Sequence, residues 1–272
     1  MNIEEYAAFS HGHEGGNPAG VVIADTHPSE DEMRKVAADL GHSETAFAAG
    51  SGTDWHVRYF APESEVPFCG HATIALGAAL AKKFGSQTYN LTTLAGPIYV
   101  EAQAERGLTA TLTSAPTSQE KASPALVDQA CALFGWDAGD LTRTPVIADA
   151  GARHLVLGLP SRVALAEMKY EFDKGQTFMR DHGLVTLLLM FEAEDGTVHT
   201  RNPFASGGVY EDPATGAASA ALGGWFRDAG LRDGAFDIHQ GDDMGVPSRL
   251  HVAPLPTCGA GVQVSGSVRE MR

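Results

Sequence analysis

The chain has 272 residues, of which 43% are hydrophobic and 19% charged, and its formal net charge at pH 7 is −15. These values are typical of a globular protein, and the acidic excess argues against nucleic acid or an anionic membrane as a partner. The three cysteines form no CxxC pair, no apolar run reaches the ~20 residues of a membrane span, and residues 1–5 lack a signal-peptide pattern, so we expect a cytoplasmic protein.

Strands and one amphipathic helix are predicted in the first half of the chain. Hydrophobic and polar residues alternate in 55–60 and 108–113, which is typical of half-buried strands. A helix is predicted over 30–40, because Ser29 and Glu32 can form a capping box and Gly41 can end it. The expected strands of this half are 2–9, 19–24, 44–49, 55–60, 88–94, 97–103 and 108–113.

The polar, turn-rich stretch 114–121 is the predicted linker to the second half. After it, Ser123 followed by Pro124 predicts another helix start. The elements on either side of the linker come in the same order: two strands, a helix, two strands, an apolar helix and three strands. This order indicates an internal repeat. The expected strands of the second half are 145–150, 153–159, 184–192, 197–203, 235–239, 248–254 and 261–266.

Two glycine-rich stretches each lead into a helix that is apolar on every side. They are Phe68-Cys69-Gly70-His71-Ala72-Thr73 and Glu211-Asp212-Pro213-Ala214-Thr215-Gly216. A helix without a polar face belongs inside a sheet or barrel, and its first turn offers unpaired N–H groups that suit a carboxylate or phosphate. We therefore predict an α+β fold with a lobe over 1–115 around a central helix 70–84, a similar lobe over 123–265 around a central helix 213–228, and a C-terminal tail over 266–272.

The expected chemistry is proton transfer, because signatures of nucleotide binding, serine hydrolysis and zinc proteolysis are missing. The stretch His11-Gly12-His13-Glu14 is interpreted as a solvated loop, so no metal site is predicted. Glu44 starts an apolar strand, and a carboxyl group in such surroundings can take and return a proton near neutral pH. The alternative is an exposed glutamate at a strand end.

Three further side chains at the two helix starts are candidates, each with a simpler alternative. His71 could donate or accept a proton, or be an ordinary core histidine. Asp212 could take part in the reaction or only cap a helix. Cys69 could act as a base or be a buried inert thiol. No cysteine lies near the second helix start, so a symmetric two-thiol racemase mechanism is not expected.

Five stretches occur together and in a characteristic order along nearly the whole chain. They are Gly16-Asn17-Pro18-Ala19-Gly20-Val21-Val22, Ser43-Glu44-Thr45-Ala46-Phe47, Arg58-Tyr59-Phe60-Ala61-Pro62 leading into Glu65-Val66-Pro67-Phe68-Cys69-Gly70-His71-Ala72-Thr73, Glu211-Asp212-Pro213-Ala214-Thr215-Gly216, and Gln240-Gly241-Asp242-Asp243-Met244-Gly245-Val246-Pro247-Ser248. In these stretches the chain resembles the PhzF family of isomerases, which is related in fold to diaminopimelate epimerase.

The resemblance implies two barrel-like domains with the active site in the cleft between them, no cofactor, and usually a homodimer. Matched by motif, the catalytic residues are Glu44, His71 and Asp212. The expected substrate-binding residues are Asn17, Gly70, Thr73, Gly216 and Ala217. Relatives often carry a serine at the position of Ala217, which implies a different substrate contact in this chain.

The function predicted from the sequence is a cofactor-independent isomerase that moves a proton on a small carboxylic acid, with Glu44 as the acid and base. One alternative is an epimerase or racemase in which Cys69 is one base and Glu44 or Asp212 the other. Another is a non-catalytic member of the fold that binds a metabolite or a protein, for which Ala217 is the only indication.

Overall fold

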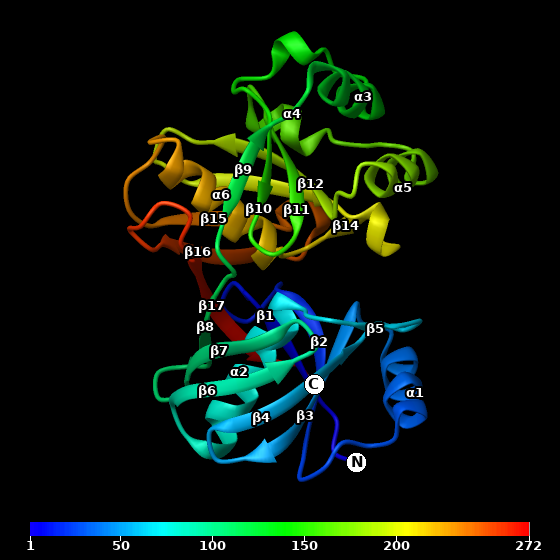
Figure 1. Ribbon diagram of the computed structural model, residues 1–272, viewed down its shortest axis with the longest axis vertical. Helices are drawn as coiled ribbons and strands as arrows, with labels where there is room; N and C mark the ends of the chain where they lie inside the picture. The colour runs from blue at the N-terminus through cyan, green and yellow to red at the C-terminus, as the bar shows by residue number, and fades with distance from the viewer. Residues whose placement is uncertain (272) are drawn as a thin grey trace. The chain divides into compact units, whose positions relative to one another are not determined.

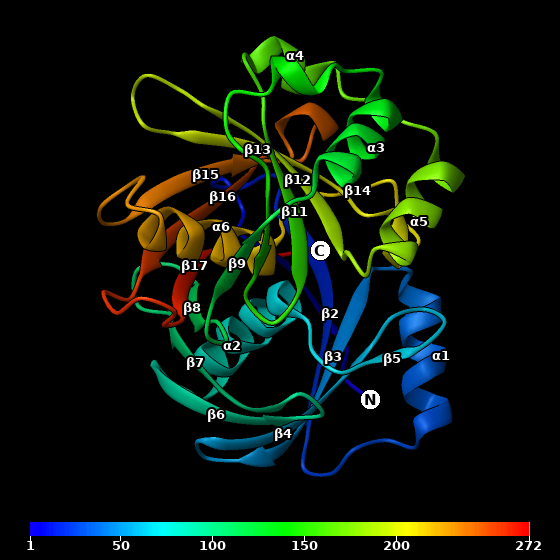
Figure 2. The same cartoon turned by 45° about the horizontal axis from the view of Figure 1, so that its top comes forward.

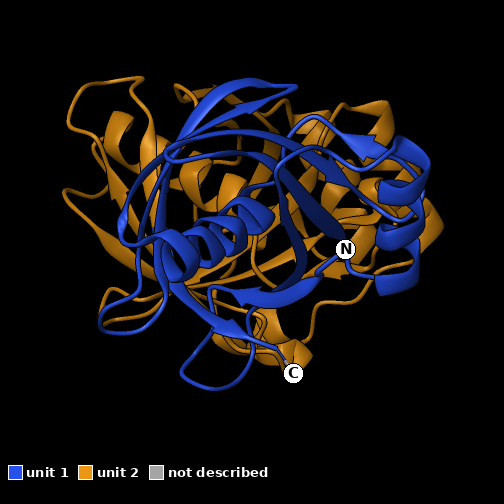
Figure 3. Ribbon diagram, turned by 90° about the horizontal axis from the view of Figure 1, so that it is seen from below, with its two compact units in different colours: residues 1–113, 265–272 blue, residues 114–264 orange. Residues whose placement is uncertain are grey.

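The computed structural model describes residues 1–271, which form two compact units. Unit 1 contains Met1–Thr113 and the residues from Ser265 onward, and unit 2 is Ser114–Val264 (Figure 3). The last strand of the chain therefore returns to the unit in which the chain begins. No helix in the described part of the chain is long and apolar enough to cross a membrane.

Unit 1 is a closed barrel with one helix inside it and one outside (Figure 1). Its elements are β1 (Glu4–Ala8), β2 (Asn17–Ala24), α1 (Glu30–Leu40), β3 (Glu44–Ser51), β4 (Asp54–Phe60), β5 (Glu65–Val66), α2 (Gly70–Phe84), β6 (Gln87–Thr93), β7 (Gly96–Gln103), β8 (Thr109–Thr113) and most of β17 (Val262–Glu270). The barrel runs β1-β2-β3-β4-β6-β7-β8-β17 and closes where β17 pairs with β1. The outer helix α1 packs against β3 and β4.

The central helix α2 spans Gly70–Phe84, and every residue from His71 to Ala81 is buried. Strands β1, β2, β3, β7 and β8 pack around it, as Figure 3 shows from below. Such close approach needs small side chains. A Cβ added at Gly77 would come 2.7 Å from Val100 Cγ2 in β7. The alanines and glycines on every face of this helix therefore allow the sheet to close around it.

Unit 2 repeats this architecture with additional helices (Figure 2). Its elements are β9 (Ser118–Lys121), α3 (Pro124–Phe134), η1 (Ala138–Asp140), β10 (Val146–Asp149), β11 (Arg153–Gly158), α4 (Arg162–Ala166), α5 (Phe172–Asp181), β12 (Thr186–Glu192), β13 (Val198–Pro203), η2 (Ala205–Gly207), β14 (Glu211–Asp212), α6 (Gly216–Asp228), β15 (Phe236–Gln240), η3 (Asp242–Met244), β16 (Ser248–Pro254) and the start of β17. Strands β9, β10, β11 and β16 pack against α6.

The predicted internal repeat is confirmed by the strand pairing. In unit 1, β17–β1 and β1–β2 are antiparallel, β2–β3 is parallel, β3–β4 is antiparallel, β4–β6 is parallel and β6–β7 is antiparallel. In unit 2, the pairs β9–β10, β10–β11, β11–β12, β12–β13, β13–β15 and β15–β16 follow the same succession of senses. The helices repeat too, because Gly223 of α6 lies against Val252 as Gly77 lies against Val100.

Three sequence predictions of element boundaries need correction. The last part of the expected linker is strand β9, whose side chains are all exposed and therefore gave no hydrophobic signal. The expected tail 266–272 continues as strand through Glu270, held by backbone pairing to β1. Helix α6 begins at Gly216 instead of residue 213, because Glu211–Asp212 forms a short strand with β13 first. Each correction depends on backbone partners that are distant in the sequence.

A buried histidine in unit 2 predicts that stability falls in mild acid. His154 in β11 is 0% exposed, its Nδ1 lies 2.8 Å from Thr186 Oγ1, and burial lowers its pKa to about 3. The folded state thus keeps this imidazole neutral while the unfolded chain protonates it below pH ~6.5. The stabilisation is complete above pH ~6.5 and is lost at up to about 1.4 kcal/mol per pH unit as the pH falls toward the folded-state pKa.

Urea unfolding at several pH values between 7 and about 4.5 measures this loss. His154→Gln should remove most of the decrease in unfolding free energy that His154 causes as the pH falls. His251→Gln, which changes an exposed histidine paired with Asp237, should not remove it. Equal slopes in the native protein and His154→Gln would exclude His154 as the cause.

Candidate active site

The barrel of unit 1 brings the start of a strand to the start of the central helix. Glu44 is the first residue of β3, where it lies opposite Ala19 of the parallel strand β2. Cys69 is the N-cap of α2, and His71 lies in its first turn. Because α2 fills the barrel that β3 helps to form, these three side chains meet although Glu44 is 25 residues from Cys69.

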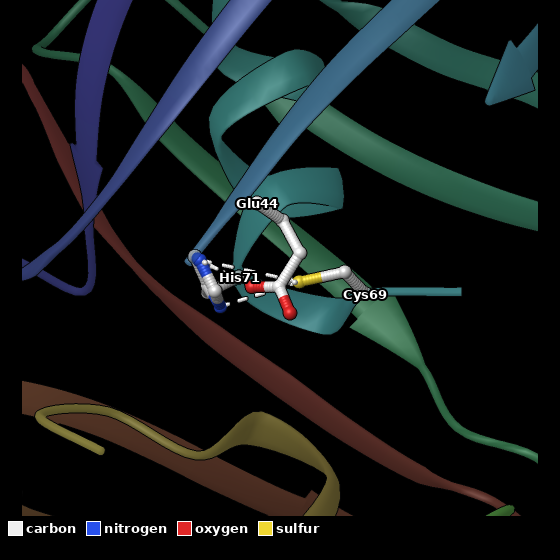
Figure 4. A group of neighbouring side chains, drawn as sticks. All are labelled: Glu44, Cys69 and His71. Carbon is white, nitrogen blue, oxygen red and sulfur yellow. Dashed lines mark hydrogen bonds and ion pairs between the residues drawn. The ribbon is translucent and has the colours of Figure 1, made fainter. Parts of the chain in front are cut away.

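The three side chains are in mutual contact (Figure 4). Cys69 Sγ donates to Glu44 Oε2 at 3.4 Å and lies 3.3 Å from His71 Nδ1. Glu44 Oε2 is in turn 3.5 Å from His71 Nε2. The side chains of Glu44 and His71 are only 14% and 7% exposed, so both groups are largely withdrawn from water. We name Glu44, Cys69 and His71 the proton-transfer group, after the reaction that the sequence predicts for them.

A second layer of hydrogen bonds holds the proton-transfer group. Ser43 Oγ lies 3.3 Å from His71 Nε2. Thr73 Oγ1 donates to the Cys69 carbonyl oxygen at 2.7 Å, which leaves Thr73 to accept from the Tyr59 hydroxyl, also at 2.7 Å. Burial raises the pKa of Tyr59, so this hydroxyl keeps its proton and remains a donor. The start of α2 is therefore tied to strand β4.

The proton-transfer group combines three titratable groups with the positive end of a helix. The Cys69 side chain makes no capping hydrogen bond, so it does not occupy the N–H groups of the first turn. These N–H groups can receive an anion while a neighbouring carboxylate, imidazole or thiol moves a proton. The ligand atoms of the group also lie within 4.8 Å of one another, and a carboxylate, a thiolate and an imidazole could together bind a zinc-like ion.

The three predicted substrate-binding residues of unit 1 lie in different environments. Gly70 is half-buried, and a Cβ added to it would meet no atom within 4 Å, so there is open space beside the helix start. Asn17 is 2% exposed at the first position of β2, and its role stays a prediction. Thr73 is 0% exposed, with its hydroxyl engaged by Tyr59 and Cys69. The Thr73 hydroxyl thus supports the start of α2, and the substrate-binding role expected of Thr73 stays a prediction.

In unit 2, Asp212 is held in a buried hydrogen-bond network before the start of α6. Thr215 Oγ1 donates to Asp212 Oδ2 at 2.5 Å, and Gln240 Nε2 donates to both the Asp212 carbonyl oxygen and Thr215 Oγ1. The N-cap of α6 is Thr215, so Asp212 is not the cap residue that its simpler interpretation required. Gly216 and Ala217 are half-buried in the first turn of α6.

The predicted repeat extends to a residue-by-residue alignment of the two helix starts, which the sequence patterns alone did not supply. Strand pairing sets Glu65 opposite Phe60 and Glu211 opposite Pro203, and each central helix begins five residues after its glutamate. This register aligns Glu65-Val66-Pro67-Phe68-Cys69-Gly70-His71-Ala72-Thr73 with Glu211-Asp212-Pro213-Ala214-Thr215-Gly216-Ala217-Ala218-Ser219.

The alignment shows that the repeat preserves the scaffold and changes the chemistry. Thr215 occupies the position of Cys69, and Ala217 occupies that of His71. Ser219 donates to the Thr215 carbonyl oxygen as Thr73 does to Cys69. Only unit 1 therefore places a thiol and an imidazole at its helix start.

Gln240 is a residue of this network that sequence reasoning missed. It is 1% exposed, and its Oε1 also accepts from the Thr215 N–H at 3.1 Å. Phe236 and Ile238 precede it on the buried face of β15. A polar residue at an apolar register position was the signal that could have identified it, because a buried amide needs partners for both its donors and its acceptor.

Comparison with known proteins places these features in context. Residues 6–267 match the model of the family described as phenazine biosynthesis-like protein, PhzC-PhzF. A relative in Bacillus subtilis (strain 168), "Uncharacterized isomerase YfhB", is 30% identical over 262 residues, which cover 92% of this chain and 89% of the relative.

Solved structures confirm the predicted α+β fold. The Bacillus anthracis phenazine biosynthesis protein of the PhzF family has a TM-score of 0.84 at 21% identity, covering 100% of this chain and 98% of that chain. A probable proline racemase from Agrobacterium radiobacter K84 has a TM-score of 0.66 at 11% identity, covering 99% and 90% respectively. At these identities the likeness concerns the fold alone.

Proposed function

The chain belongs to the phenazine biosynthesis-like PhzC-PhzF family, and from this premise we propose that it is an isomerase that moves a proton on a small carboxylic acid. The observation that supports the proposal is the contact of Glu44 with Cys69 and His71 at the start of α2. One place in the molecule thus offers both a group that can carry a proton and N–H groups that suit a carboxylate.

In the proposed reaction, Glu44 removes a proton from one carbon of the substrate and returns it to another carbon. The substrate carboxylate lies against the first-turn N–H groups of α2, beside the open space at Gly70. These N–H groups stabilise negative charge as it spreads from the reacting carbon toward the carboxylate. His71 holds or relays a proton next to Glu44, and the low exposure of both side chains limits exchange with water.

The proposed reaction requires no cofactor, since a carboxyl group performs both proton transfers. Asp212, Gly216 and Ala217 are retained as predicted contributors on the strength of the family motif, and Gln240 as the residue that positions Asp212. A homodimer and a cytoplasmic location also remain predictions.

Deuterium incorporation into a panel of acids tests the proposal. The protein is incubated in D₂O with cyclic and unsaturated amino and hydroxy acids, and C–H signals are followed by proton NMR. Glu44-dependent exchange or migration of a C–H proton in at least one acid is expected. Silence across the panel, together with binding of an acid detected by thermal shift, would favour the non-catalytic alternative.

The contact of the Cys69 thiol with both Glu44 and His71 keeps an epimerase reaction as a second candidate. Cys69→Ala separates the two reactions. If Glu44 alone exchanges the proton, activity should fall less than about 10-fold, whereas loss of one of two bases should cost about 10²–10⁴-fold. Deuterium exchange rates of native protein and variant on the same acid supply the measurement, and Cys131→Ala, at a buried cysteine in α3, is the matched control.

A further inference from the structure

Two histidines of unit 2 face each other on neighbouring strands outside the proton-transfer group. His199 of β13 lies in register with His239 of β15, and their rings are 5.3 Å apart at an interplanar angle of 83°. Asp242 of η3 follows two residues after Gln240. One ligand atom from each of His199, His239 and Asp242 lies within 4.8 Å of the other two, and all three side chains are half-buried.

Imidazole nitrogens are common metal ligands, and this pair has a nitrogen to offer. Within residues 1–271, His199 Nδ1 is buried and has no hydrogen-bond partner. A buried polar atom without a partner is costly, and an ion bound at this nitrogen would remove that cost.

The surrounding charges permit a cation. Arg162 is paired with Asp243, and Arg249 makes two hydrogen bonds to Asp242, at 2.9 and 3.2 Å. A carboxylate has about four lone-pair sites, so Asp242 can keep Arg249 and still bind an ion. Asp195 adds a further negative charge close to both histidines. The acidic residues of this neighbourhood therefore balance its arginines.

We propose that His199, His239 and Asp242 form a binding site for a divalent transition-metal ion, with nitrogen and oxygen ligands typical of Zn²⁺. The ion joins β13, β15 and η3 at one point. His239 directly precedes Gln240, whose side chain holds Asp212 and Thr215 on the buried face of β15. The site thus stabilises the strand that carries this network, and it does not depend on the proposed isomerase reaction.

Zinc titration of the full-length protein without a histidine tag tests the site. Isothermal titration calorimetry should give one Zn²⁺ per chain, with affinity reduced at least ~10-fold in His199→Ala and in His239→Ala. His251→Ala, in an exposed pair on the neighbouring strand β16, should bind like the native protein. In melting curves, Zn²⁺ should raise the unfolding temperature of the native protein by roughly 5 °C. It should not raise the unfolding temperature of His199→Ala or His239→Ala.

The proton-transfer group must be separated from this site, since it also has a metal-binding donor set. Cys69→Ala is therefore titrated in parallel, and Co²⁺ absorption reports whether a thiolate binds the ion. Retained binding in Cys69→Ala without a thiolate band is expected. The proposal would be overturned if Cys69→Ala no longer bound Zn²⁺, or if His199→Ala bound Zn²⁺ as tightly as the native protein. It would also be overturned if the protein bound inorganic phosphate and no metal ion.

Discussion

Glu44→Gln is expected to lower the rate of proton exchange by at least about 10²–10⁴-fold while the protein remains folded and binds ligand. The amide keeps the size of the side chain and can still contact Cys69 and His71, which lie 3.4 and 3.5 Å from Glu44 Oε2. It cannot take and return a proton. The loss should therefore appear in turnover and not in ligand affinity or unfolding temperature.

Deuterium exchange on an acid that reacts with the native protein measures the effect of Glu44→Gln. Glu63→Gln, at an exposed position in the same unit, is the matched control and should exchange at the native rate. Native-like exchange in a folded Glu44→Gln protein would remove Glu44 from the mechanism. The same result would leave the fold and the family assignment unaffected.

Arg201→Met is expected to destabilise the protein by about 3–5 kcal/mol, because it leaves the Glu211 carboxylate buried without its cation. The side chains of Arg201 and Glu211 are 9% and 3% exposed and form a two-point pair. Arg201 Nη1 also donates to the Ala166 carbonyl oxygen at 2.9 Å. The pair thus joins β13, β14 and the end of α4.

The internal repeat supplies the control for this prediction. Arg58 and Glu65 form the equivalent pair in unit 1, but their side chains are 27% and 17% exposed. Water can solvate the remaining charge there, so Arg58→Met should cost about 1 kcal/mol. Urea unfolding compares the two variants. Similar losses in both would show that burial does not set the energy of these pairs.

The double variant Arg201→Met with Glu211→Leu sharpens the comparison. Removing both charges should restore most of the stability lost in Arg201→Met, since no uncompensated charge stays buried. About 1 kcal/mol should remain lost, because the Ala166 carbonyl oxygen no longer accepts its hydrogen bond. No recovery in the double variant would contradict the proposed cause.

Local patterns were enough to predict most elements and to select Glu44, Cys69 and His71 as candidates, whose roles stay predictions. The capping box of Ser29 and Glu32 and the left-handed Gly41 delimit α1 as expected, and Ser123 caps α3 by accepting from the Leu126 N–H. Helix α2 lies over the predicted 70–84 because its small apolar residues have no polar face. The sequence His11-Gly12-His13-Glu14 forms the expected exposed turn. In each case the physical cause lies within a few residues along the chain.

The sequence alone thus determined most strands, the existence of the two central helices and the family motif, because periodicity, caps and short-range spacing encode them locally. Only the tertiary structure decided that Glu44 touches Cys69 and His71, that Gln240 holds Asp212, and that the last strand pairs with β1. These contacts depend on barrel closure and on strand register, which join residues far apart in the chain. A one-residue change of register would turn each side chain to the opposite face without altering any local pattern.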